Sequence, residues 1–155
     1  MAYKVLNNIG LIDTSTNALT SLKTGLLVIV VNKDTNKDSA FKDLNKVSKS
    51  YISKTITSHL KDSGSSILLP KIDGIEAENI MLVKGLDANA PMHKWISSYQ
   101  AIAKKANSIN AKDLSIMSGA ISPSGKDELW LIEMIAKTVE SNVYIFSETK
   151  NKTAK

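Results

Sequence analysis

The chain contains no cysteine among its 155 residues. This absence excludes a disulfide framework, a thiolate metal site and a cysteine nucleophile, and it suits a reducing compartment. The N-terminal sequence MAYKVLNNIG lacks the basic start and long apolar run of a secretory signal, and the run Leu26 to Val31 is far too short to span a bilayer. We therefore expect a cytoplasmic protein that neither crosses nor enters a membrane.

Arginine is also absent, so lysine supplies all 20 basic side chains against 15 acidic ones, for a net charge of +5. Arginine carries the planar fork used for bidentate contacts to guanine and phosphate, whereas lysine is a flexible point charge that discriminates little between sequences. The lysines are spread along the chain among Asp and Glu, as on a solvated surface. Specific nucleic-acid recognition is not expected. A basic domain that binds DNA weakly and in a salt-sensitive way is kept as an alternative, ranked below the two interpretations given at the end of this subsection.

The length is typical of one domain, since a domain usually has roughly 100 to 200 residues. A chain of this size can bury a sufficient core without a disulfide or a metal. We expect a single domain over residues 1–146. Residues 147–155 form a polar tail with three lysines, which fits the start of an interdomain linker.

Five segments carry the patterns of strands. The segment Leu26 to Val31 (LLVIVV) is a continuous apolar run, typical of a central strand covered on both faces. The polar segment Asp13 to Gly25 predicts a loop, and Lys71 to Glu78 predicts an acidic loop between two strands. The predicted strands are Tyr3 to Ile12, Leu26 to Val31, Ser65 to Pro70, Asn79 to Lys84 and Asp113 to Met117.

Apolar residues recurring at three- and four-residue spacings predict one long helix from Ser39 to Lys61, with Asp38 or Ser39 as its N-cap. Its outer face carries a stripe of lysines, for which solvation is favoured over binding of an anion. The apolar residues of this helix are Phe41, Leu44, Val47, Tyr51 and Ile52, and the lysines of the stripe are Lys42, Lys46 and Lys49.

Two further helices are predicted, one after the fourth strand and one after the fifth. One begins at Pro91, with Asn89 as its N-cap, and the other runs from Asp127 to about Phe146. The apolar stripe of the first comprises Met92, Trp95, Ile96, Tyr99, Ile102, Ala103 and Ala106. The last helix has Leu129, Ile132, Ile135, Ala136, Val139, Val143 and Phe146 on one side, broadened by Trp130, Leu131 and Met134. So broad an apolar surface indicates deep burial or an interface.

Several sequence segments within these predicted elements, taken in their order along the chain, resemble a known protein family. The strand ending ILLP, the loop IDGIEAE and the strand NIMLVKGLD follow LLVIVV and a helix, and the chain closes with ELWLIEMIAKTVESNVYIFSETKNK. In this order they resemble the N-terminal domain of the leucyl aminopeptidase (cytosol aminopeptidase) family, over Leu26 to Lys152. The resemblance implies an α/β, three-layer, macro-domain-like sandwich with a mixed central β-sheet and helices on both faces.

The same resemblance implies a domain without catalytic chemistry of its own. The family hydrolyses the N-terminal peptide bond of peptides with two divalent metals, zinc or manganese, held by clustered carboxylates and a lysine. The family's motif NTDAEGR is absent here, and we assign no catalytic, cofactor-binding or metal-binding residue to this chain. We expect it to be inactive alone, to support a homohexamer and access to the active sites, and to continue into a catalytic domain of about 300 residues.

Several residues have side chains that occur in binding or catalytic sites, and for each of them a structural role is favoured. His59 and His93 lack companion ligands, and an acidic loop between strands usually holds its carboxylates in solvent. Aromatic residues at helical spacing usually pack in the core. A stand-alone macro-type module that binds ADP-ribose or a related nucleotide is the second interpretation, although neither Ile72 to Asn79 nor Ser118 to Gly125 has the glycine-rich run that cradles a diphosphate. The acidic and aromatic residues in question are Asp73, Glu76, Glu78, Trp95 and Tyr99.

Overall fold

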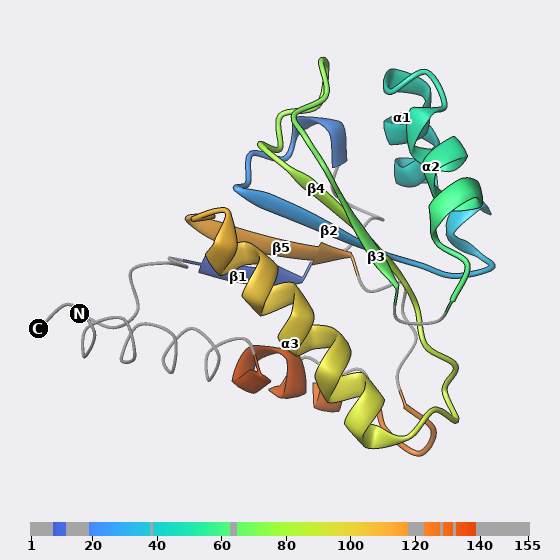
Figure 1. The fold of residues 1–155 in the computed structure, drawn as a ribbon, viewed down its shortest axis with the longest axis vertical. Helices are drawn as coiled ribbons and strands as arrows, with labels where there is room; N and C mark the ends of the chain where they lie inside the picture. The colour runs from blue at the N-terminus through green and yellow to red at the C-terminus, as the bar shows by residue number, and fades with distance from the viewer. Residues whose placement is uncertain are drawn as a thin grey trace, which may run out of the picture.

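The computed structural model describes residues 8–11, 19–37, 39–62, 65–117, 123–127, 129–131 and 133–138. They form a five-stranded sheet with the order β1-β5-β2-β4-β3 and with helices on both faces (Figure 1). Neighbouring strands are parallel, except that β3 is antiparallel to β4. The strands are β1 (Asn8–Leu11), β2 (Leu26–Val31), β3 (Ser66–Leu69), β4 (Ile80–Lys84) and β5 (Asp113–Met117). The α/β fold class predicted from the sequence is confirmed.

Strand β2 lies at the centre of the sheet and is covered on both faces. Leu26 and Val28 belong to the core cluster that the helix of residues 92–108 completes, whereas Leu27 and Ile29 belong to the cluster on the opposite face. All four side chains are 0% exposed. The uninterrupted apolar run therefore arises because alternate side chains enter two separate cores.

One face of the sheet carries two helices, α1 (Ser39–Val47) and α2 (Tyr51–His59), and the prediction of one long helix is wrong. The helix is interrupted at residues 48–50, where Lys49 and Ser50 have φ angles of 55° and 64°. Asn45 stabilises the break, because its backbone oxygen accepts a hydrogen bond from Ser50 N (2.8 Å) and its Oδ1 accepts one from Ser53 N (3.1 Å) in the first turn of α2.

The break also changes which side chains of this layer are buried. Phe41 of α1 and Ile52 of α2 lie in the core, but Val47 and Tyr51 are 39% and 48% exposed. Ile56 packs against the same core cluster as Ile52. A continuous helix would have placed Val47 and Tyr51 on the inner stripe, so the prediction that they face the core is wrong. The N-cap candidate Asp38 lies outside the described residues.

The predicted first loop contains a short 3-10 helix, η1 (Leu19–Ser21), whose Leu19 is 1% exposed. A second 3-10 helix, η2 (Thr35–Lys37), lies between β2 and α1. Of the first predicted strand, residues 8–11 form β1 and the remaining residues lie outside the described part. The described portion of Asp13 to Gly25 is therefore packed structure and not only a connecting loop.

The other face of the sheet is covered by α3 (Met92–Ser108) and by helical residues 129–131 and 133–138. Pro91, and not Asn89, occupies the N-cap position of α3. The buried residues of α3 include most of the predicted apolar stripe, namely Trp95, Tyr99, Ile102, Ala103 and Ala106. No helix in the described part of the chain combines the length and apolar character needed to cross a membrane.

The last helix buries only part of the apolar side that the sequence predicts. Leu131 and Ile135 are each 1% exposed and share a core cluster with Trp95, whereas Leu129 is 62% exposed and Ala136 is exposed. A helix that is apolar over two stripes can bury either of them, so its sequence alone does not specify the buried stripe. Packing against α3 selects the stripe that contains Leu131 and Ile135. Ile132, Val139, Val143, Phe146 and the tail 147–155 lie outside the described residues.

Lys49 and Ser50 hold a left-handed conformation that costs a residue with a Cβ atom about 1–2 kcal/mol. We expect Lys49→Gly to raise the free energy of unfolding by about 1 kcal/mol, because glycine adopts this conformation without that penalty. Urea denaturation followed by far-UV circular dichroism measures the change. Lys46→Gly, inside α1, is the matched control and should lower stability by about 1 kcal/mol. Destabilisation of similar size by both variants would contradict the assignment of the break.

Burial raises the pKa of the Tyr99 phenol to about 12. An unfolded tyrosine has a pKa near about 10, so between about pH 10 and pH 12 the unfolded state loses a proton that the folded state keeps. Stability should therefore fall as the pH rises through this window. Between pH 8 and pH 11 we expect the unfolding free energy of the wild type to fall by about 1 kcal/mol more than that of Tyr99→Phe. Equal losses in the two proteins would rule out this contribution of Tyr99.

Candidate functional site

The carboxyl ends of the parallel strands are the usual place for a ligand in an open α/β sheet. Here the connection after β4 is joined to the segment before the last helix by a hydrogen bond from Ser124 N to Ala88 O (2.7 Å). A surface hollow of about 490 Å³ lies beside this contact. It is lined by Gly125, Lys126, Asp127 and Trp130.

The side chains of this hollow mainly organise the start of the last helix. Asp127 accepts a hydrogen bond from Trp130 N on its Oδ1 (2.8 Å), which is the geometry of a capping aspartate. The ammonium of Lys126 lies 5.4 Å from the centre of the Trp130 ring, within the range of a cation–π contact. A cation on an aromatic face and a capping carboxylate do not constitute an acid–base pair, so the hollow has no evident catalytic chemistry.

The acidic loop between β3 and β4 holds its carboxylates in solvent. Ile75 and Ala77 are buried, and the intervening Glu76 and the next acidic residue, Glu78, are exposed. The loop is fixed by its backbone, because Glu76 N donates to Thr20 O and Glu78 N donates to Thr24 O, each at 2.9 Å. This alternation turns the apolar side chains toward the core and the acidic ones away from it.

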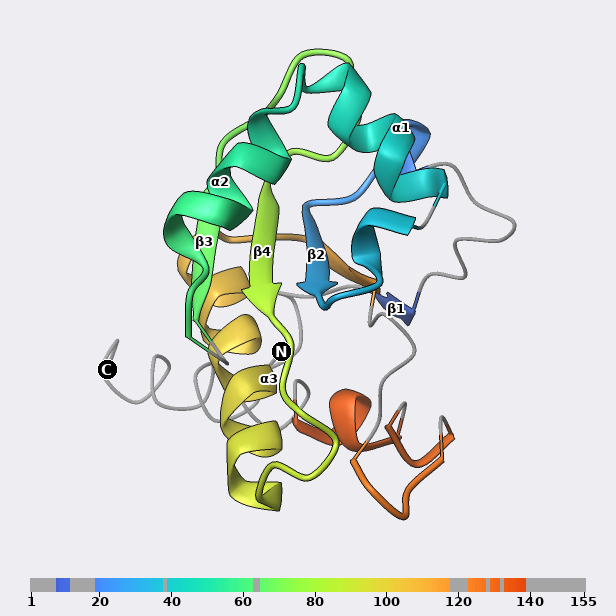
Figure 2. The ribbon, with the colours of Figure 1, turned by 90° about the vertical axis from the view of Figure 1, so that its right-hand side faces the viewer.

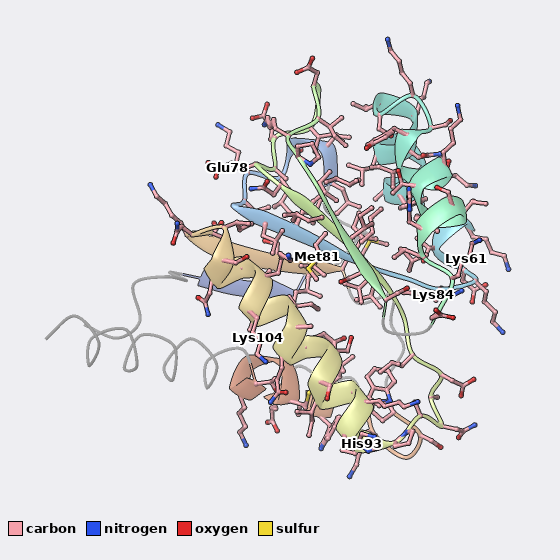
Figure 3. All side chains as sticks on the ribbon, viewed as in Figure 1. Lys61, Glu78, Met81, Lys84, His93 and Lys104 are labelled. Atoms are coloured by element: carbon pink, nitrogen blue, oxygen red, sulfur yellow. The ribbon has the colours of Figure 1, made fainter. Side chains whose placement is uncertain are left out.

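The possible metal ligands are scattered over the molecule. His59 ends α2 on one face of the sheet, whereas His93 lies in the first turn of α3 on the other. Figure 3 shows Glu78 and His93 at opposite ends of the molecule. Within the described ranges, no group of three or more His, Asp or Glu side chains is placed to hold a metal ion.

The aromatic and basic candidates of the sequence are likewise parts of the framework or of the surface. Trp95 and Tyr99 are each 3% exposed, so neither offers a face for a ligand to stack on. Lys42 and Lys46 are exposed on α1, while Lys49 follows the end of that helix. The stripe of three lysines on one helix is therefore not present as predicted.

A polar cluster that the sequence did not predict lies at the amino ends of β2 and β5. Asp113 Oδ1 accepts hydrogen bonds from Gly25 N (2.5 Å) and from Thr24 Oγ1 (3.1 Å), and Ser115 Oγ donates to Thr24 Oγ1 (3.3 Å). A Cβ atom on Gly25 would lie 3.1 Å from Lys112 N, so the close approach of the two chains favours glycine there. The sequence feature that could have indicated this cluster is the polar residue next to the apolar run of each strand, Thr24 before β2 and Asp113 at the start of β5.

These observations describe a framework, and comparisons with known proteins supply its context. The sequence model of the N-terminal domain of the cytosol aminopeptidase family matches residues 27–153. Among solved structures, a mutant of tomato leucine aminopeptidase is similar, with a TM-score of 0.60 and 22% sequence identity. The similarity covers 88% of this chain and 28% of the tomato chain. A search of curated protein sequences finds no match.

The family match extends from β2 to beyond the last described helical residues, and so includes both helical layers and all strands except β1. The structural similarity supports the same α/β fold independently of close sequence identity. The chain therefore belongs to the cytosol aminopeptidase family, whose N-terminal domain it matches.

Proposed function

We propose that this chain serves as the non-catalytic N-terminal domain of a leucyl (cytosol) aminopeptidase. The observation that carries the proposal is the family match over residues 27–153. We take residues 1–146 as one domain and residues 147–155 as the start of a linker to the catalytic domain. The complete protein would then be a cytoplasmic enzyme that releases N-terminal amino acids from peptides.

The proposal assigns the hydrolytic chemistry to sequence beyond this chain. Two-metal hydrolysis requires carboxylates that converge on a pair of ions and stabilise the attacking and leaving groups. The carboxylates discussed above instead face solvent from a loop, cap a helix or, at Asp113, accept hydrogen bonds from Thr24 and Gly25. Zinc or manganese would bind in the catalytic domain. The matched region is only 28% of the tomato chain, so most of that enzyme's length lies outside the part that this chain resembles.

The proposal gives this domain a role in assembly and in access to the active sites of a hexamer. Support comes from apolar side chains left outside the two cores. Met92, at the start of α3, is 37% exposed, and Leu129, in the last helix, is 62% exposed. Such side chains suit contact with a further domain or subunit, since burying them removes apolar surface from water.

The gene offers the first test. We expect its reading frame to continue past the codon for Lys155 for about 300 residues and to encode NTDAEGR together with a set of metal-binding carboxylates. Sequencing the locus measures this directly. A stop codon after Lys155 would contradict the proposal, and titration calorimetry with ADP-ribose would then test the stand-alone macro-type interpretation.

The second test separates assembly from catalysis in the complete gene product. We expect the full protein to hydrolyse leucine p-nitroanilide with zinc or manganese and to elute as a hexamer in size-exclusion chromatography with light scattering. The 155-residue chain alone should show no hydrolysis with either metal. Removal of residues 1–146 should reduce the oligomer size, while Lys94→Ala, an exposed substitution on α3, serves as the matched control. A truncated protein that remained a fully active hexamer would refute the assembly role.

A further inference from the structure

Strand β3 forms one edge of the described sheet, where it pairs with β4 and has no second neighbour (Figure 2). Solvent reaches this edge, because Ser66 is exposed and both Ile67 and Leu68 are only half-buried. Ile67 packs against the core beneath α1 and α2, and Leu68 packs against the core beneath α3. The edge thus presents apolar side chains on both faces as well as a strand backbone.

The register of β3 on β4 determines which backbone groups point outward. Lys84 N donates to Ser65 O (2.8 Å), so these opposed residues form a hydrogen-bonded pair of the antiparallel ladder. Such pairs alternate with non-hydrogen-bonded pairs, which assigns Ile67 to the inward-bonding set and Ser66 and Leu68 to the outward set. The N–H and C=O groups of Ser66 and Leu68 therefore point away from β4 and can pair with another strand.

We propose that two copies of this chain associate by antiparallel pairing of their β3 strands about a twofold axis at Ile67. In this register Ser66 of each copy faces Leu68 of the other, and the two residues exchange their N–H···O bonds. Ile67 of one copy then opposes Ile67 of the other at the close spacing of a non-hydrogen-bonded pair. The two sheets become one continuous sheet through an isologous contact.

The ends of β3 favour a second copy as the occupant of this edge. The segment before the strand carries exposed Asp62, and the segment after it carries exposed Lys71. Antiparallel pairing brings the Asp62 end of one copy to the Lys71 end of the other, so opposite charges meet on both sides of the axis. Pro70 has no N–H to donate, which limits the ladder to the short strand and opposes open-ended growth.

This inference rests on the geometry of the sheet edge and not on the proposed role in an aminopeptidase. It predicts a reversible dimer of the 155-residue chain, measured by sedimentation equilibrium from about 10 μM to about 1 mM, a range suited to a small interface. High salt should weaken the dimer, because the pairing of Asp62 with Lys71 is exposed to screening.

Two substitutions at one position isolate the backbone contribution. Ser66→Pro removes the outward N–H and leaves the inward bonds of β3 to β4 in place, so the dissociation constant should rise at least about tenfold. Ser66→Ala retains the N–H and should leave the dissociation constant unchanged. Far-UV circular dichroism and thermal melting establish that each variant is folded.

Hydrogen exchange in the wild type provides a readout that does not depend on the folding of any variant. The amides of Ser66 and Leu68 should exchange more slowly as the protein concentration rises, while the amide of exposed Lys104 should not change. A protein that stays monomeric to 1 mM, or a dimer that Ser66→Pro leaves intact, would overturn the proposal. Concentration-independent exchange at both amides would do the same.

Discussion

The burial of β2 on both faces is the constraint on which the rest of the molecule depends. Leu26 and Val28 enter one core and Leu27 and Ile29 enter the other, all of them without exposed surface. A strand with no solvent-facing side requires a helical layer on each face and a paired strand along each edge. The packing of α1 and α2 on one side and of α3 on the other, with β4 and β5 as neighbours, follows from that requirement.

A partly buried polar contact aligns this apolar strand with its neighbour. Hydrophobic contact is non-directional and does not by itself specify which residues lie opposite one another. Asp113, at the start of β5, accepts hydrogen bonds from Gly25 and Thr24 just before β2, and so joins the amino ends of the two strands. A register shift would leave the polar groups of this cluster unpaired where water reaches them only in part, which is costly.

Most strands and the α/β class were predicted from the sequence, because apolar runs and their order along the chain are local signals. The family was predicted from the resemblance of particular sequence segments to its N-terminal domain. The candidate site residues were less informative, since their chemistry depends on which side chains converge. His59 and His93 lie on opposite faces of the sheet, and Glu76 and Glu78 face solvent because Ile75 and Ala77 take the buried positions. The polar cluster at Asp113 combines residues 89 positions apart, a separation that no local pattern reveals.

The sequence by itself determined that Leu26 to Val31 is a central strand, that α3 buries one apolar stripe, and that the order of elements is that of an aminopeptidase N-terminal domain. Periodicity and composition are sufficient for the first two conclusions, whereas the third came from the resemblance of particular sequence segments to that family. Tertiary structure decided where the predicted helix after β2 breaks, which stripe of the last helix is buried, and which backbone groups of β3 face outward. Each of these depends on contacts between segments distant in sequence, and their energies outweigh local propensity.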